Sequence, residues 1–428
     1  MTFPYYHLRS GITLLIDCRF VGPAVDSSVT GGALLPPVRL LLEPIPATLT
    51  QNIVKIMNSI SPARIVGLDT LRALAIALVL MSHYNGFVRN APGFGAIGSI
   101  GWAGVDLFFV LSGYLIGNQL LAPAARGESL DLKTFFARRL LRTLPNYYVV
   151  LAVYLMLSGS SIAGKSMAPL WRFLTFTQNF GMNYGETFTH SWSLCIEEQF
   201  YLLLPLVVMT LAGSRRSPRL LWCTVVASIA AGMTVRGIAF MDGKDVFAAP
   251  VYYSSFARFD ELLPGVALAL LKNFHPVGFA RLLRHGNALL AAGLASAAAV
   301  LYGVMNEAPT AFLASTFGFS LVAISFALLV CSALSPSSLL NRLRIPGASS
   351  LALWSYAVYL AHKPVFMALS PQLQEWGVDA SAALTIVVVM AIGIFSGWLL
   401  YLLVESPFMQ LRARFYATGG VKARSMLV

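Results

Sequence analysis

The stretch RALAIALVLMSH, residues 72–83, is apolar over almost its whole length, yet it begins with an arginine and ends with a histidine. Of the ten residues between Arg72 and His83, only Ser82 is polar. With its apolar flanks, the segment reaches the roughly 20 residues that a helix needs to cross the hydrocarbon core of a bilayer. Ionisable side chains are costly inside a membrane, so they are candidates for function by default. The stretch therefore predicts a transmembrane helix with a functional face.

The composition of the whole chain agrees with a membrane location. The 428 residues are 57% hydrophobic and only 11% charged, and the mean hydropathy is +0.71. Soluble domains carry roughly 25% charged residues, so a soluble protein is excluded. The net charge of +12 would suggest nucleic acid in a soluble protein, but basic residues also collect on cytoplasmic loops of membrane proteins. The four cysteines form no CxxC or metal-ligand spacing, so we expect neither a disulfide framework nor a metal site.

Apolar segments of similar length recur along the chain. About ten of them can span a bilayer at roughly 20 residues each. The loops between them alternate between a set rich in lysine and arginine and a set that carries few. Because basic loops stay in the cytoplasm, this alternation predicts an all-α polytopic membrane protein with both termini cytoplasmic. The expected spans are centred on residues 66–86, 101–120, 144–160, 199–213, 219–240, 255–272, 286–303, 312–333, 350–370 and 382–404.

Three parts of the chain differ in composition. Residues 1–60 hold scattered prolines and only a short apolar run, so we expect an extension that is disordered or that results from a misassigned start, with Met57 as a possible start. Residues 61–408 hold all of the expected spans. Residues 409–428 are basic, and we expect them to form a cytoplasmic tail.

Arg72 and His83 are expected to share one face of their helix. They are eleven positions apart, which is close to three turns and about 16 Å along the axis. Each has a simpler explanation, because Arg72 could pair with Asp69 at i, i+3 and His83 could be an interfacial histidine. Together, on a helix with few other polar residues, they predict a lined cavity.

A second constellation is HSWSLCIEEQFYLLLP, residues 190–205. Glu197 and Glu198 enter the fourth expected span from the outer side, at the membrane level predicted for His83. A carboxylate beside an imidazole would hold its tautomer and raise its basicity. Adjacent residues of a helix point in different directions, so only one glutamate should face inward, and acidic residues also suit a helix N-terminus. Trp192 and Tyr201 of the same segment are candidates for substrate contact or for a structural role.

A third constellation, FFARRLLRTLPNYY at residues 135–148, faces the cytoplasm in the predicted topology. Arg138, Arg139 and Arg142 lie within two turns at a helix entry. The planar guanidinium group suits phosphate, although arginines at this position also follow from topology alone.

The remaining candidates lie near the ends of other expected spans. GVDLFFVLSGYLIG, residues 104–117, holds Asp106 and Ser112, and its small residues favour close helix packing. ARFDELLPG, residues 257–265, holds Arg258 and Asp260, which we interpret mainly as part of a structural ion cluster. His362 lies within the ninth expected span, in LWSYAVYLAHKP.

Several of these motifs together resemble the acyltransferase-3 family of integral-membrane O-acyltransferases that modify cell-surface glycans. LDTLRALAIALVLMSHY resembles the first span of that family, whose hallmark is the spacing of arginine, ten residues and histidine. FFVLSGYLI, RRLLRTLPNYY, SWSLCIEEQFYLLLP and WSYAVYLAHKP resemble its later motifs in the same order. The resemblance covers about residues 60–408. The chain departs from the family in its N-terminal extension, and we expect no appended hydrolase-like domain of the kind that some members carry.

The resemblance implies transfer of an acyl group, usually acetyl, from cytoplasmic acyl-CoA to a hydroxyl of a glycan outside a bacterial inner membrane. Acyl-CoA would be a co-substrate, and no bound cofactor is expected. The CoA phosphates would contact Arg138, Arg139 and Arg142, and the pantetheine arm would pass Arg72 over about 15 Å, half the hydrocarbon thickness. His83 would act as general base or as nucleophile, oriented by one of the two glutamates. Arg72 would anchor the donor or stabilise the oxyanion.

Two other interpretations stay open from the sequence. A transporter or exporter of a polysaccharide or metabolite would line its path with the same charged residues. A protein of this family without activity could serve as a subunit of a polysaccharide assembly complex. The acceptors open to an active enzyme of this family are lipopolysaccharide O-antigen, exopolysaccharide, peptidoglycan, a lipo-oligosaccharide signal and a small glycosylated metabolite.

Overall fold

The computed structural model describes residues 65–160, 162, 164–212, 218–306 and 311–415. The chain divides into two units, Met1–Met57 and Asn58–Val428, and every described residue belongs to the second. The predicted extension over residues 1–60 therefore lies outside the described residues, as does the tail beyond residue 415. Within the described ranges the regular secondary structure is helical, which confirms the predicted all-α membrane fold.

Each of the ten expected spans overlaps a helix, but the count of ten spans is not confirmed. By length and composition, seven described helices can cross a membrane, or eight if one pair bent by 113° is a single span. The seven are α2 (Val66–Tyr84) with η1 (Asn85–Arg89), η2 (Gly101–Ala103) with α4 (Gly104–Ala125), η3 (Thr189–Ser191) with α7 (Trp192–Ala212), α8 (Pro218–Met241), α13 (Gly286–Ala298) with η5 (Ala299–Asn306), α14 (Phe312–Leu334), and α17 (Ala383–Leu400) with η6 (Tyr401–Glu405) and α18 (Ser406–Phe415). The bent pair joins α10 (Ser255–Arg258), η4 (Phe259–Leu262) and α11 (Leu263–Phe274) to α12 (Pro276–Leu283).

Two further helices are long enough to span a bilayer but are less apolar. They are α5 (Leu132–Met156) and α16 (Ala348–Glu375). The first carries the arginines of the third constellation, and the second carries the buried pair His362 and Lys363. Polar side chains on these helices, some of them buried like His362 and Lys363, lower the hydropathy by which spans are recognised. The remaining described elements are short: α3 (Gly95–Ser99), α6 (Leu170–Leu174), α9 (Ala249–Tyr252) and α15 (Leu339–Arg342).

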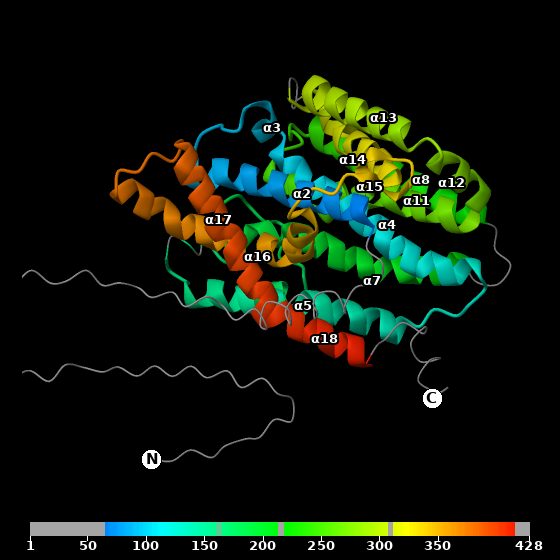
Figure 1. Cartoon of the computed structure of the whole chain (residues 1–428), viewed down its shortest axis with the longest axis horizontal. Coiled ribbons are helices and arrows are strands. Elements are labelled where there is room, and N and C mark those ends of the chain that lie inside the picture. Colours follow the sequence, from blue (N-terminus) through cyan, green and yellow to red (C-terminus); the bar gives the residue numbers. More distant parts are fainter. Residues whose placement is uncertain (1–64, 161, 163, 213–217, 307–310, 416–428) are drawn as a thin grey trace, which may run out of the picture. The chain divides into compact units, whose positions relative to one another are not determined.

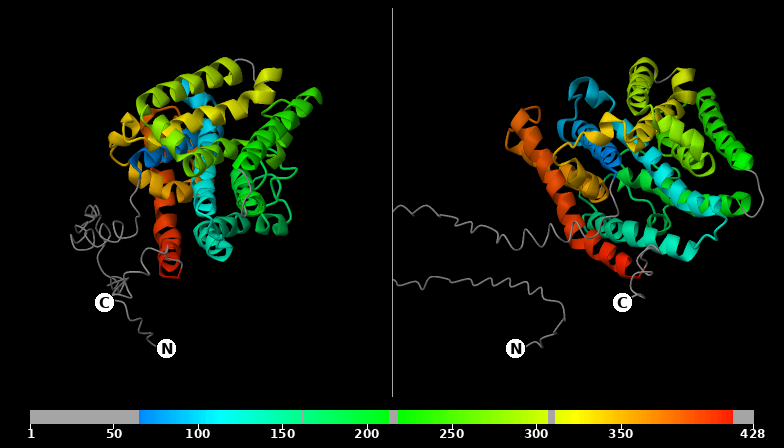
Figure 2. Two further views of the ribbon diagram at one scale, coloured as in Figure 1. Left: turned by 90° about the vertical axis from the view of Figure 1, so that its right-hand side faces the viewer. Right: turned by 45° about the vertical axis from the view of Figure 1, so that its right-hand side comes forward.

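The arrangement places α2, α4 and α14 at the centre of the bundle (Figure 1). Of their apolar windows, 56%, 67% and 72% are buried, against 22% for α8 and for α17 with α18. The central helices pack against one another, α11 packs along α4, and α16 packs between α2 and α17. The C-terminal α18 lies against α5 (Figure 2). The helix that carries Arg72 and His83 is therefore an interior helix, most of whose surface faces protein.

The contact between α4 and α11 depends on glycine. A Cβ atom at Gly113 would collide with the carbonyl oxygen of Leu262, and one at Gly265 would collide with the carbonyl oxygen of Val110. Small residues at such contacts let two membrane helices approach backbone to backbone. Close packing was the role expected for this part of α4, and it fixes the position of the neighbouring Ser112.

A fully buried ion-pair network joins α4, α8 and the bent segment that begins at Ser255. Arg258 donates to Asp106 Oδ1 at 3.0 Å and also to Glu261. Arg236 donates to both carboxylate oxygens of Asp260, at 2.7 and 2.9 Å. Opposite charges that are removed from water need such paired geometry, because an unpaired buried charge is strongly destabilising. Asp106, Arg258 and Asp260 therefore lie in the framework between helices, and none of them lines either chamber described below.

Candidate functional site

Two cavities inside the bundle both have lining residues on the central helix α2. We call the first the arginine chamber; its volume is about 180 Å³, and Arg72, Arg139 and Arg142 line it. We call the second the histidine chamber; its volume is about 310 Å³, and His83, His190 and Lys363 line it. Arg72 and His83 therefore face two adjoining chambers, where the helical spacing alone predicted one lined cavity.

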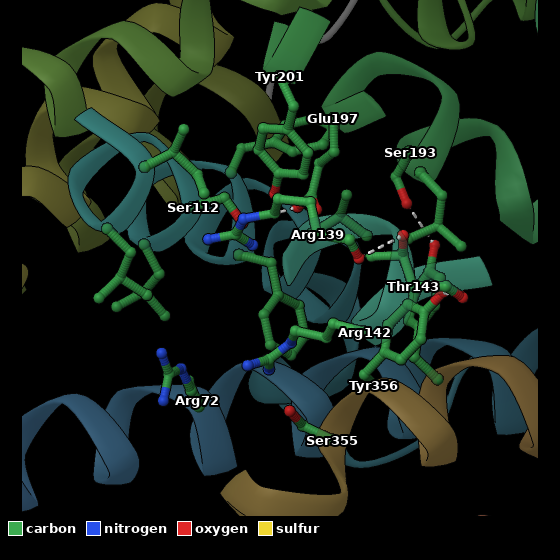
Figure 3. Close-up of a pocket in the computed structure, with 18 of the residues that line it drawn as sticks. Arg72, Ser112, Arg139, Arg142, Thr143, Ser193, Glu197, Tyr201, Ser355 and Tyr356 are labelled. Atoms are coloured by element: carbon green, nitrogen blue, oxygen red, sulfur yellow. Dashed lines mark hydrogen bonds between the residues drawn. The ribbon is translucent and has the colours of Figure 1, made fainter. Parts of the chain in front are cut away.

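The arginine chamber collects positive charge from two helices (Figure 3). Arg139 and Arg142 are three residues apart on α5, so they share one face of that helix. Arg72 enters from α2 and also contacts Asp69 Oδ1 at 3.4 Å, which is the i, i+3 pair that the sequence offered as the simpler explanation. Three guanidinium groups face a single lining carboxylate, that of Glu197. This balance suits an anionic ligand such as a phosphate.

Glu197 is held inside the arginine chamber. Its carboxylate accepts hydrogen bonds from the Ser112 hydroxyl at 2.9 Å and from the Tyr201 hydroxyl at 2.7 Å. The Arg139 guanidinium stacks on the Tyr201 ring, 5.0 Å from its centroid. Ser112 therefore contacts the carboxylate of Glu197, in addition to lying in a closely packed part of α4.

The expected contact between the glutamate pair and His83 is not formed. The residue of this segment that lies beside His83 is His190, whose ring centroid is 6.4 Å away. Glu197 follows seven residues later, which is about 10 Å further along a helix. This offset carries its side chain into the arginine chamber, away from the imidazole of His83.

Two sequence candidates do not line the arginine chamber. Glu198 follows Glu197 and points away from the cavity, as expected for adjacent residues of a helix. Arg138 precedes Arg139 and is likewise outside the lining. Only one residue of each adjacent like-charged pair therefore lines the arginine chamber, namely Glu197 and Arg139.

His83 has a histidine partner. Its Nδ1 lies 2.6 Å from Nε2 of His362, and the two rings lie edge to edge with an interplanar angle of only 15°. Nδ1 of His362 lies 2.7 Å from the carbonyl oxygen of Val358, one turn earlier on α16. Phe87 and Phe366 pack edge-on against the two imidazoles. The orientation of the His83 ring is therefore fixed by α16.

The rest of the histidine chamber is mainly aromatic. Trp192 lies in its wall and stacks near Tyr252 and Tyr253, at centroid distances of 5.0 and 5.7 Å. The buried Arg258 guanidinium lies behind this wall, 5.0 Å from the Trp192 ring. Among the described residues, no aspartate or glutamate lines this chamber. The other aromatic side chains of the lining are Phe87, Trp102, Tyr184, Phe247 and Tyr359.

Val105 and Tyr359 line both chambers, so they form the partition between them. The Tyr359 hydroxyl bonds the Ser193 hydroxyl at 2.7 Å and donates to the carbonyl oxygen of His190. These bonds anchor the ring to the segment that begins α7. Val105 and Tyr359 are the residues at which the linings of the two chambers overlap.

Most of the residues that line the histidine chamber are not assigned to the site by sequence patterns. Among them are His190, Lys363 and Tyr359. Lys363 donates to the Thr189 hydroxyl, and its ammonium lies 4.7 Å from the Phe87 ring centroid. His190 and Lys363 belong to motifs quoted above, so the available signal was a histidine and a lysine inside apolar segments. In the parts of the chain that the structure covers, no cluster of histidine, cysteine, aspartate or glutamate is suited to hold a metal.

Comparison with known proteins agrees with these motifs. A family model described as an acyltransferase domain matches residues 65–402. The peptidoglycan O-acetyltransferase OatA of Listeria monocytogenes is 30% identical over 328 residues, which cover 72% of this chain and 50% of that protein. The putative peptidoglycan O-acetyltransferase YrhL of Bacillus subtilis is 31% identical over 330 residues, 73% of this chain and 50% of that protein.

A shorter match, 31% identical over 237 residues, joins 52% of this chain to 37% of the O-acetyltransferase OatA of Staphylococcus aureus. The chain spans about half the length of the first two relatives. No solved structure was found to match it. The family match includes both chambers and every helix that lines them. This multi-pass membrane chain belongs to the acyltransferase-3 family, as its ordered motifs predicted.

Proposed function

We propose that this protein is an O-acetyltransferase of a bacterial inner membrane that moves an acetyl group from cytoplasmic acetyl-CoA to a hydroxyl of a cell-wall glycan. The observation that carries the proposal is the meeting of the arginine and histidine chambers at Val105 and Tyr359. An acyltransferase needs a site for an activated donor and a site for an acceptor, and the reacting groups must approach each other. The names of the relatives, peptidoglycan O-acetyltransferases, support a cell-wall glycan as the acceptor.

The arginine chamber is the proposed donor site. CoA carries several phosphates, and the lining supplies three guanidinium groups against one carboxylate. Bidentate guanidinium–phosphate contacts are among the strongest polar contacts that proteins form. Arg72 lies in this chamber and not in that of His83, so its geometry favours the anchoring role over the oxyanion role. The thioester end of the pantetheine arm would then reach the partition.

The histidine chamber is the proposed acceptor site. An aromatic lining with a few polar groups is the usual composition of a small-molecule pocket, and it suits the apolar faces of a sugar ring. His83 takes the proton of the acceptor hydroxyl while the hydroxyl oxygen attacks the thioester carbonyl carbon. The new C–O bond forms, the C–S bond breaks, and the leaving thiolate takes the proton from His83. The products are an O-acetyl glycan and CoA thiol.

The proposal is tested by turnover of the purified full chain in detergent or nanodiscs. Release of CoA thiol from acetyl-CoA would be measured with and without peptidoglycan fragments and other sugar acceptors. The variants are His83→Ala and Arg72→Ala, and the matched control is Arg126→Ala, which removes an exposed arginine that pairs with Glu128 outside both chambers. Radiolabelled acetyl-CoA would identify the acetylated product.

We expect thiol release that requires an acceptor, is abolished in His83→Ala and is unchanged in Arg126→Ala. Equal rates in the intact chain and His83→Ala would contradict the proposed role of His83. Movement of the glycan or metabolite across vesicle membranes, with no thiol released, would support the transporter interpretation instead. The expected acyl group is acetyl, so faster transfer from a longer acyl-CoA would contradict that part of the proposal.

A further inference from the structure

We infer that His362 is a positioning residue that fixes the tautomer of His83 and leaves Nε2 of His83 as the basic atom. The inference rests on the proposed function, because it assigns a role to the base of the acyl transfer. It concerns a residue on α16, 279 positions away from His83 in the chain.

The hydrogen bonds run in one direction, from His83 to a backbone carbonyl. The carbonyl oxygen of Val358 can only accept, so Nδ1 of His362, at 2.7 Å, must carry a proton. In a neutral imidazole the other nitrogen is then an acceptor. That nitrogen, Nε2 of His362, lies 2.6 Å from Nδ1 of His83. His83 must therefore donate from Nδ1, and its Nε2 keeps the lone pair.

The alternative is a doubly protonated His362, which would reverse the bond and place the His83 proton on Nε2. His362 and the next residue, Lys363, are both buried. A full charge on His362, without a carboxylate in the lining of the chamber to balance it, would be strongly unfavourable. His190 is the third imidazole near the pair, 5.8 Å from His362 between centroids. The surroundings therefore favour a neutral His362.

Packing and hydrogen bonding together hold both imidazoles in this arrangement. The ring centroids are 4.9 Å apart and the ring planes differ by 15°, so the rings lie edge to edge and nearly coplanar. Phe87 contacts the His83 ring edge-on, and Phe366 does the same to the His362 ring. Turning either ring over would exchange a hydrogen-bonded nitrogen for a carbon, so the hydrogen bonds themselves hold each ring in its orientation.

His362 thus does what a carboxylate does for the base of a hydrolytic triad. When Nε2 of His83 takes the acceptor proton, the Nδ1 proton stays in its bond to His362, and the neutral imidazole accepts from the imidazolium. The proton then leaves from Nε2 of His83 to the thiolate. His362 exchanges no proton during the reaction, and it does not contact the reacting atoms.

The first test reads the tautomer directly. Nitrogen NMR of the full chain in nanodiscs, with ring-labelled histidine, distinguishes protonated from unprotonated Nδ1 and Nε2. Spectra of His83→Ala and His362→Gln would assign the two residues by difference. We expect both histidines of the intact chain to be protonated at Nδ1 and unprotonated at Nε2. A His83 that is protonated at Nε2 would overturn the inference, and this result does not depend on any acetyl transfer.

The second test separates positioning from packing by conservative replacement. In His362→Gln, the side-chain amide can still accept from His83 and donate toward Val358, whereas leucine in His362→Leu can do neither. We expect His362→Leu to lower kcat by about 100-fold or more, as loss of a tautomer-fixing partner does elsewhere, with an unchanged KM for acetyl-CoA. His362→Gln should recover most of that loss. The control is His275→Leu, an exposed histidine that bonds Trp222.

Equal activity of the glutamine and leucine variants would overturn the inference, because only one of them keeps the bonds. If His362→Leu does not fold, the glutamine variant and the tautomer of the intact chain still decide the question. Absence of acetyl transfer in the intact chain would contradict the proposed function, while the measured tautomer would still support or overturn the bond direction. The two failures are therefore distinguishable.

Discussion

The two chambers along α2 differ in how they can recognise a ligand. The arginine chamber concentrates guanidinium groups around Glu197, so charge dominates it. The histidine chamber presents aromatic faces around His83, so apolar area and a few polar atoms dominate it. Under the proposed function, an anionic donor and an acceptor with apolar faces would bind separately and would meet where Val105 and Tyr359 line both chambers. Four variants test this separation of roles.

Arg258→Met should have the largest effect, because it damages the buried framework that joins α4, α8 and the bent segment. The substitution leaves the carboxylates of Asp106 and Glu261 buried without their shared cation. Breaking a buried ion pair in this way costs about 3–5 kcal/mol. Thermal unfolding of the variant in detergent should show a large drop in Tm, or the folded protein should not accumulate. The control is Lys244→Met on an exposed loop, and an equal Tm in both variants would contradict the structural role of Arg258.

His83→Ala should affect only the histidine chamber. We expect kcat to fall by about 100-fold or more, which is the usual contribution of a positioned general base. The dissociation constant of acetyl-CoA, measured by calorimetry, should stay unchanged because the arginines are untouched. Loss of donor binding along with turnover would mean that the two chambers do not act separately.

Arg142→Gln should produce the opposite pattern. Removing one of the three guanidinium groups should raise KM for acetyl-CoA by roughly tenfold, about 1.4 kcal/mol, and should change kcat much less. The matched control is Arg126→Gln, since Arg126 is exposed and pairs with Glu128. The effect should shrink as salt is added, because charge attraction is screened. A fall in kcat with constant KM would contradict a donor-binding role.

Val105→Ala should have the smallest effect, on selectivity. The smaller side chain widens the partition, so transfer from propionyl-CoA should improve relative to acetyl-CoA. One methylene is worth at most about 1–3 kcal/mol in such a pocket, and we expect a change of roughly tenfold or less in the ratio of kcat/KM values. Val226→Ala on the exposed face of α8 is the control. An unchanged ratio would indicate that the acyl group does not pass between Val105 and Tyr359.

Much of the candidate site was predictable because its residue types are rare in apolar helices. Arg72, His83, Arg139 and Glu197 all stand out by that rule, and all of them line a chamber. The chamber that Glu197 enters was not predictable in the same way. The depth of Glu197 in the bundle depends on where α7 begins relative to α2. Its offset of seven residues from His190 amounts to about 10 Å along a helix.

Residue patterns alone were enough to predict the membrane class, the helical segments and the family, and to expect Arg72 and His83 on one helix face. These features depend on composition, on motif order and on periodicity within one helix. The folded chain was needed to show two chambers, the hydrogen bonds of Ser112 and Tyr201 to Glu197, and the contact of His362 with His83. Such contacts join helices far apart in the chain, and they depend on how deeply each helix sits against its neighbours, which no local pattern encodes.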